Sequence, residues 1–102
     1  MALRFGEQEF DSVLVKDHAA MRMLYRNISQ AELSELLEAG EVLEDYPDDY
    51  PFPSKLIFKM VNNRPLHAVV AMDGLKKVLI IVTVYEPDSQ KFEPDFKTRK
   101  KA

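Results

Sequence analysis

The chain has 102 residues, of which 46% are hydrophobic and 30% charged, and its formal net charge is −3. This composition predicts one soluble domain over residues 1–102, and it excludes a disordered chain and, since no apolar run approaches ~18 residues, a membrane-spanning one. The absence of cysteine excludes disulfides and thiolate metal sites, and the negative charge argues against a protein whose whole surface binds nucleic acid.

The first half of the chain predicts a short strand and two helices. Residues 12–16 predict an edge strand that leads into a helix over 17–27, with Asp17 as the N-cap. Ser29 and Glu32 have the spacing of a capping box for a second helix over 30–39. Gly40 is then expected to end that helix in the left-handed conformation.

The second half predicts strands over residues 41–45, 54–61, 66–72 and 78–85. The proline-rich run 46–53 predicts a loop, and residues 88–102 predict a turn of helix followed by a flexible basic tail over 97–102. The fold class is therefore α+β, with two helices on one face of an antiparallel β-meander of three to four strands.

A turn over 73–77 would pair Met72 with Val78 and Leu66 with Val84, and would place these residues on the face that the helices cover. The opposite face would then carry His67 across from Thr83. That face is apolar at one end, so we expect a partner, the C-terminal segment or a second copy of the chain to cover part of it.

One helix combines cationic and apolar sides. His18, Arg22 and Arg26 follow at i, i+4 and i+8, so they share one side of the helix over 17–27. Guanidinium groups and an imidazole are suited to binding RNA phosphate, although an ordinary solvated helix face has the same spacing. The apolar side, which we expect the core to bury, consists of Ala20, Met21, Leu24, Tyr25 and Ile28.

A second candidate site lies in the predicted sheet. His67 can act as a general acid or base, and the hydroxyl of Tyr85, one diagonal step from it, can position or protonate a leaving oxygen. Arg64 would add a cation at the same end. The alternative is that His67 and Tyr85 are ordinary sheet residues with a polar tip.

The loop after residue 44 is both acidic and aromatic. It lacks the ligand spacing and the glycine of a calcium loop, so it predicts no metal site. Aromatic side chains often anchor protein partners, although a loop that only wraps the sheet edge would have the same composition. The candidate partner-binding residues are Tyr46, Asp48, Asp49, Tyr50 and Phe52.

Several short blocks of the chain resemble a small prokaryotic family of unknown function. The blocks are His18-x3-Arg22-x3-Arg26-x-Ile28-Ser29, Gly40-Glu41-Val42, Asp45-Tyr46-Pro47-Asp48-Asp49, Arg64-Pro65-Leu66-His67 and Thr83-Val84-Tyr85-Glu86-Pro87. The resemblance covers about residues 13–99. That family is similar to the RelE/BrnT/MqsR group of toxins, and its members are often encoded beside a YgiT-type zinc-finger protein.

This resemblance implies a cytoplasmic type II toxin with a RelE-like fold that cleaves messenger RNA without a metal ion or cofactor. It implies that His18 and Arg22 grip phosphate, that His67 serves as acid or base, and that Tyr85 orients the reacting group. It also implies neutralisation by a small antitoxin. The alternative is a non-catalytic domain that binds its zinc-finger neighbour through the acidic aromatic loop and the exposed sheet face.

Overall fold

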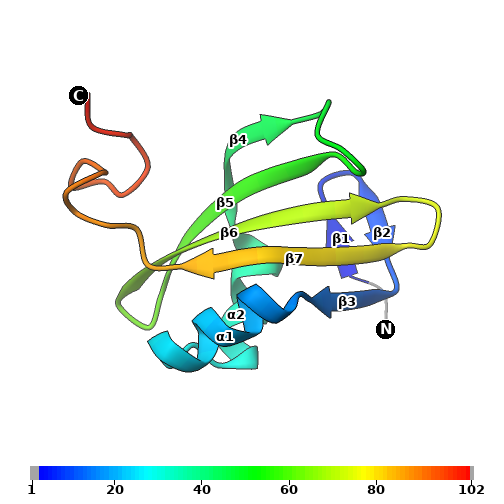
Figure 1. Cartoon of the computed structure of the whole chain (residues 1–102), viewed down its shortest axis with the longest axis horizontal. Helices are drawn as coiled ribbons and strands as arrows, with labels where there is room; N and C mark the ends of the chain where they lie inside the picture. Colours follow the sequence, from blue (N-terminus) through cyan, green and yellow to red (C-terminus); the bar gives the residue numbers. More distant parts are fainter. Residues whose placement is uncertain (1–2, 102) are drawn as a thin grey trace.

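The computed structural model describes residues 3–101 and confirms the α+β class (Figure 1). The elements are β1 (Leu3–Phe5), β2 (Gln8–Phe10), β3 (Ser12–Val15), α1 (Asp17–Arg26), α2 (Gln30–Ala39), β4 (Glu41–Tyr46), β5 (Ser54–Val61), β6 (Arg64–Asp73) and β7 (Val78–Tyr85). Neither helix in residues 3–101 is long and apolar enough to cross a membrane.

The main sheet has five strands in the order β3-β7-β6-β5-β4. Strands β4 to β7 form the predicted antiparallel meander. The predicted edge strand β3 is also present, but it pairs parallel with β7, so the sheet is mixed rather than purely antiparallel. Strands β1 and β2 form a separate two-stranded hairpin, for which the sequence predicted nothing definite.

One face of the sheet carries the core. Both helices and the hairpin contribute to a single apolar cluster, in which each fully buried large side chain contributes about 1.5–3 kcal/mol. Its members from the helices and hairpin are Phe5, Phe10, Ala19, Met23, Leu33, Leu36 and Leu37. Those from the strands include Ile57, Val61, Leu66, Ala68, Val70, Leu79, Ile81 and Val84.

The predicted pairing of β6 with β7 is wrong by one or two residues. Met72 pairs with Leu79, and a register shift lies between Val69↔Thr83 and Val70↔Ile81, which leaves Val82 as an extra residue on β7. Such a bulge changes which side chains of a strand face the core. Consequently His67 lies directly opposite Tyr85 instead of Thr83.

The helix ends confirm part of the prediction. The capping box is present, because the Glu32 amide donates to Ser29 Oγ (3.0 Å) and the Ser29 amide donates to Glu32 Oε1 (2.9 Å). Asp17 is not the N-cap of α1; Lys16 occupies that position, and Asp17 lies in the first turn. Gly40 is not left-handed (φ −69°). A glycine is nevertheless needed there, because a Cβ would lie 2.4 Å from the Leu36 carbonyl oxygen.

The buried side of α1 differs most from expectation. Ala19 and Met23 enter the core, whereas Leu24 is 79% and Tyr25 80% exposed. The reason is the position of α1, which follows the edge strand β3 and packs beside β7 with only a narrow side covered (Figure 1). Of the predicted apolar side, Ile28 is buried, just beyond the helix end.

Arg64 joins several elements near this end of α1. Its Nη1 donates to the Arg26 carbonyl (2.7 Å) and its Nη2 to the Asn27 carbonyl (3.1 Å), so it satisfies carbonyls at the end of the helix. The same guanidinium pairs with Glu32 of the capping box (2.9 Å) and with Glu86 after β7 (3.3 Å).

We expect Arg64→Met to lower the free energy of unfolding by about 1–3 kcal/mol, because it keeps the aliphatic stem but leaves two carboxylates and two carbonyls without their donor. The measurement is urea unfolding followed by circular dichroism. Arg4→Met is the matched control: Arg4 forms only an exposed pair with Glu9, and its loss should change stability by less than about 0.5 kcal/mol. Equal losses in both variants would contradict this role of Arg64.

Candidate functional site

His67 is a fully buried polar residue on the sheet face opposite the helices. Aromatic rings surround it: Phe58 of β5 lies edge-on at 5.6 Å between ring centroids, and Phe92 of the C-terminal segment at 4.8 Å. The Tyr85 ring lies at 5.3 Å in a tilted arrangement. The C-terminal segment therefore covers part of the second face, as expected, but at the polar end where His67 lies.

The hydrogen bonds of His67 determine its tautomer. Its Nε2 lies 2.6 Å from the Phe96 carbonyl oxygen, which can only accept, so Nε2 carries a proton. Its Nδ1 lies 3.3 Å from the Tyr85 hydroxyl. Burial lowers the pKa of His67 below its usual 6.5, although the bond to Phe96 opposes this shift. In the neutral ring Nδ1 accepts, so the Tyr85 hydroxyl donates to it.

The segment after Pro87 is a set of turns and contains no helix among its described residues, contrary to prediction. The Asp95 carboxylate accepts from the amides of Lys97 (2.9 Å) and Thr98 (3.0 Å), a local bonding pattern that competes with helix formation. Phe96 has a positive φ of 60°, which is uncommon for an aromatic residue. Its carbonyl is the one that His67 contacts.

Arg99 fixes this segment to the sheet. Its guanidinium lies 5.1 Å from the centre of the Phe92 ring and pairs with Glu44 of β4 at 3.3 Å. The Tyr46 hydroxyl also donates to Glu44, and this bond, followed by the bond from Arg99, lowers the pKa of the Glu44 carboxyl. Within the predicted flexible tail over 97–102, Arg99 thus pairs with Glu44 and Lys97 pairs with Glu41. Residue 102 lies outside the described residues.

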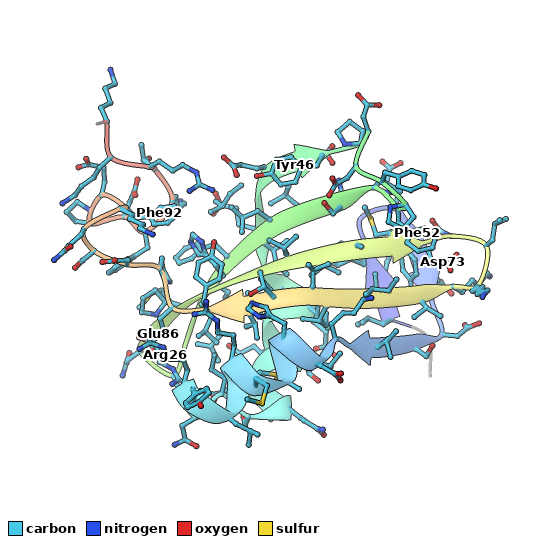
Figure 2. The ribbon with its side chains drawn as sticks, viewed as in Figure 1. Arg26, Tyr46, Phe52, Asp73, Glu86 and Phe92 are labelled. Atoms are coloured by element: carbon cyan, nitrogen blue, oxygen red, sulfur yellow. The ribbon has the colours of Figure 1, made fainter. Side chains whose placement is uncertain are left out.

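A pocket of about 340 Å³ lies between α1, the end of β7 and the C-terminal segment. Its cationic side chains are Arg22, Arg26, Lys91 and Arg99, its acidic ones are Glu86 and Asp88, and its aromatic ones are Tyr85 and Phe92. In Figure 2, Arg26 and Glu86 lie beside each other at this end of β7. The excess of positive charge suits an anion such as a phosphodiester.

The structure brings some predicted site residues together and separates others. Arg22, Arg26 and Tyr85 line the pocket, and His67 lies behind Tyr85. His18 is exposed on the first turn of α1 and does not line the pocket. Arg64 is engaged with helix-end carbonyls and carboxylates.

Two cations of the pocket, Lys91 and Arg99, were not among the predicted site residues. Their positive charge was visible in the sequence, and Arg99 belonged to the run predicted as a basic tail. Only the contacts of the C-terminal segment with His67 and Glu44 place them beside α1. Local sequence therefore could not assign them to the site.

The side chains of the acidic aromatic loop have different partners. Tyr46 bonds to Glu44, whereas Asp49 accepts from the hydroxyl of Ser54 (2.7 Å), the residue that pairs with Tyr46 across β4 and β5. Tyr50 is 94% exposed and, with Phe52, borders a separate hollow of about 260 Å³; Asp48 is also exposed. Figure 2 shows Tyr46 and Phe52 apart from each other. Within residues 3–101 no group of three or more metal-ligating side chains gathers.

Comparison with known proteins identifies the family. A family model described as a domain of unknown function, DUF4258, matches residues 15–86, a span that runs from the end of β3 to Glu86. Neither curated proteins nor solved structures give a match. The matched span includes Arg22, Arg26, His67 and Tyr85, and it ends before the C-terminal segment. The chain therefore belongs to the DUF4258 family.

Proposed function

We propose that the protein is a cytoplasmic, RelE-like type II toxin that cleaves messenger RNA without a metal ion and is neutralised by a small antitoxin, for example a YgiT-type zinc-finger protein. One observation carries the proposal: the cationic pocket contains a tyrosine whose hydroxyl bonds to a buried neutral histidine. The pocket thus combines phosphate-binding groups with a group that can exchange a proton.

In the proposed complex, Arg22, Arg26 and Arg99 bind the oxygens of the scissile phosphate. Guanidinium groups match phosphate geometry and stabilise the negative charge that develops during the reaction. Lys91 adds a further positive charge at the rim. Because these cations are gathered at the pocket, the negative net charge of the whole chain does not oppose phosphate binding there.

Tyr85 is the proposed proton acceptor for the 2′-hydroxyl. Burial raises the pKa of Tyr85, so its hydroxyl stays protonated at neutral pH and donates to His67 Nδ1. The oxygen of that hydroxyl can still accept from a substrate. A proton arriving at Tyr85 can therefore move on to His67 without leaving a charged tyrosinate.

The reaction balances as follows. The 2′-oxygen attacks the adjacent phosphorus, the bond from phosphorus to the 5′-oxygen breaks, and a 2′,3′-cyclic phosphate forms. The proton of the 2′-hydroxyl passes to Tyr85 while the proton of Tyr85 passes to His67 Nδ1. The leaving 5′-oxygen takes a proton from water, and the hydroxide that remains is neutralised when His67 and Tyr85 return the proton to solvent.

A specific observation also favours a second candidate function, a non-catalytic interaction domain. Next to the highly exposed Leu24 lies a mostly apolar hollow of about 320 Å³ between α1 and the start of α2, bordered by Ala20, Met23 and Ile28. An exposed apolar surface of this kind often contacts a partner. This candidate predicts partner binding without any change in RNA.

The first test is induced expression of the chain alone and together with its neighbouring gene, with growth and RNA integrity followed over time. We expect growth arrest with RNA cleavage, relieved by the neighbour. Tyr85→Phe should abolish the arrest, because it lowers the cleavage rate by about 10²–10⁴-fold while the ring still packs on His67.

Tyr50→Phe is the matched control and should leave arrest unchanged, since the exposed Tyr50 borders a different hollow that shares no residue with this pocket. Normal growth and intact RNA, despite soluble folded protein, would favour the interaction domain.

The cleavage rate should depend on pH through His67. Protonated His67 cannot accept from Tyr85, and burial lowers the pKa of His67, so the rate should fall on acidification with a midpoint below pH 6.5. Initial rates of cleavage of a labelled RNA by the purified protein measure this. His18→Gln, at the other histidine of the chain, should leave the profile unchanged. A midpoint above 6.5 would argue against His67.

The arginines should contribute through charge. Arg26→Gln should weaken binding to single-stranded RNA and reduce the slope of log affinity against log salt by about 0.7, the value for one lost phosphate contact. Arg4→Gln changes the net charge equally on the far hairpin and should leave the slope unchanged. Titrations by fluorescence anisotropy at several salt concentrations compare the two; identical slopes would remove Arg26 from the binding site.

A further inference from the structure

A second hollow lies on the solvent side of α1, directly beside the cationic pocket. It has a volume of about 470 Å³ and is lined by Arg22, Tyr25 and Arg26. The spacing i, i+3 and i+4 places these side chains next to one another on the helix. Arg22 and Arg26 also line the cationic pocket, so the two hollows adjoin at these arginines.

Tyr25 has no role in the core. Its side chain is 80% exposed, and within residues 3–101 its hydroxyl has no hydrogen-bond partner. The guanidinium groups of Arg22 and Arg26 likewise form no hydrogen bond or ion pair among these described residues. The acidic residues Glu86 and Asp88 line the shared pocket with them, and Asp17 lies in the first turn of the same helix.

An exposed aromatic ring between two free cations is suited to single-stranded nucleic acid. Nucleobases stack on the ring, and the flanking cations contact the backbone phosphates on either side. Such stacking tolerates any sequence, because every base has a flat face. It does require an unpaired base, which a continuous duplex does not offer.

We propose that Tyr25 is a stacking platform for an unpaired base of single-stranded RNA, whose backbone continues over Arg22 and Arg26 into the cationic pocket. This inference rests on the proposed function, since the strand is the substrate of that pocket. It adds a binding position beyond the reacting phosphate and identifies the substrate as single-stranded.

An acidic peptide is the main alternative ligand for the same surface. A peptide anchored by apolar side chains would use the hollow beside Leu24, but that hollow shares no residue with the one around Tyr25. The Tyr25 hollow instead shares both of its arginines with the cationic pocket. The arrangement of the surface therefore favours a ligand that follows the phosphate-binding groups.

The test measures binding of a short, fluorescently labelled, single-stranded 2′-O-methyl RNA, which cannot be cleaved because it lacks a free 2′-hydroxyl. Tyr25→Leu keeps an apolar side chain but removes the ring, and it should weaken binding about 5- to 150-fold. Tyr25→Trp should restore wild-type affinity or exceed it. Leu24→Ala, at an equally exposed neighbour outside the hollow, is the control and should bind as wild type.

A second RNA tests whether the bases themselves contribute to binding at Tyr25. An RNA of the same length that consists of abasic nucleotides should bind wild type and Tyr25→Leu equally. Equal binding of the 2′-O-methyl RNA to wild type and Tyr25→Leu would overturn the stacking site while leaving the endoribonuclease proposal intact. The stacking site would also be overturned if Tyr25→Leu weakened binding of the abasic RNA as much as it weakens binding of the 2′-O-methyl RNA. If wild type neither binds nor cleaves RNA, both proposals fail.

Discussion

The arrangement of the site depends on the hydrogen bonds and ion pairs of the Arg64 guanidinium group. This group connects the carbonyls at the end of α1, the capping-box glutamate at the start of α2 and Glu86 after β7. These contacts set the position of the last turn of α1 relative to the end of β7. Arg26 and Tyr85 come from those two places, so the geometry of the cationic pocket follows from a residue that does not line it.

A second constraint is the burial of His67. A buried neutral imidazole needs a partner for each ring nitrogen, because an unsatisfied polar group in an apolar site is costly. Phe96 supplies an acceptor and Tyr85 a donor, and the rings of Phe58 and Phe92 exclude water. The turns around Asp95 present the Phe96 carbonyl, so the C-terminal segment completes both the environment of His67 and one wall of the pocket.

The distribution of charge explains how a chain with a negative net charge can still have a surface that attracts phosphate. The chain is negative overall, but several acidic residues are engaged with cations inside the fold: Glu32 and Glu86 with Arg64, Glu44 with Arg99, and Glu41 with Lys97. Arg22 and Arg26 have no such partner among residues 3–101. A surface that can attract phosphate thus remains on α1, and this is the surface where we propose that the RNA strand binds.

Local sequence determined the α+β class, the capping box of Ser29 and Glu32 and the strands of the meander, because capping and strand periodicity depend on residues close together in the chain. Tertiary structure decided the rest. The extra residue Val82 set the register that pairs His67 with Tyr85, and the parallel edge strand β3 left Tyr25 exposed. The C-terminal turns brought Arg99 to the pocket. Each of these outcomes depends on contacts between distant segments, which no local pattern encodes.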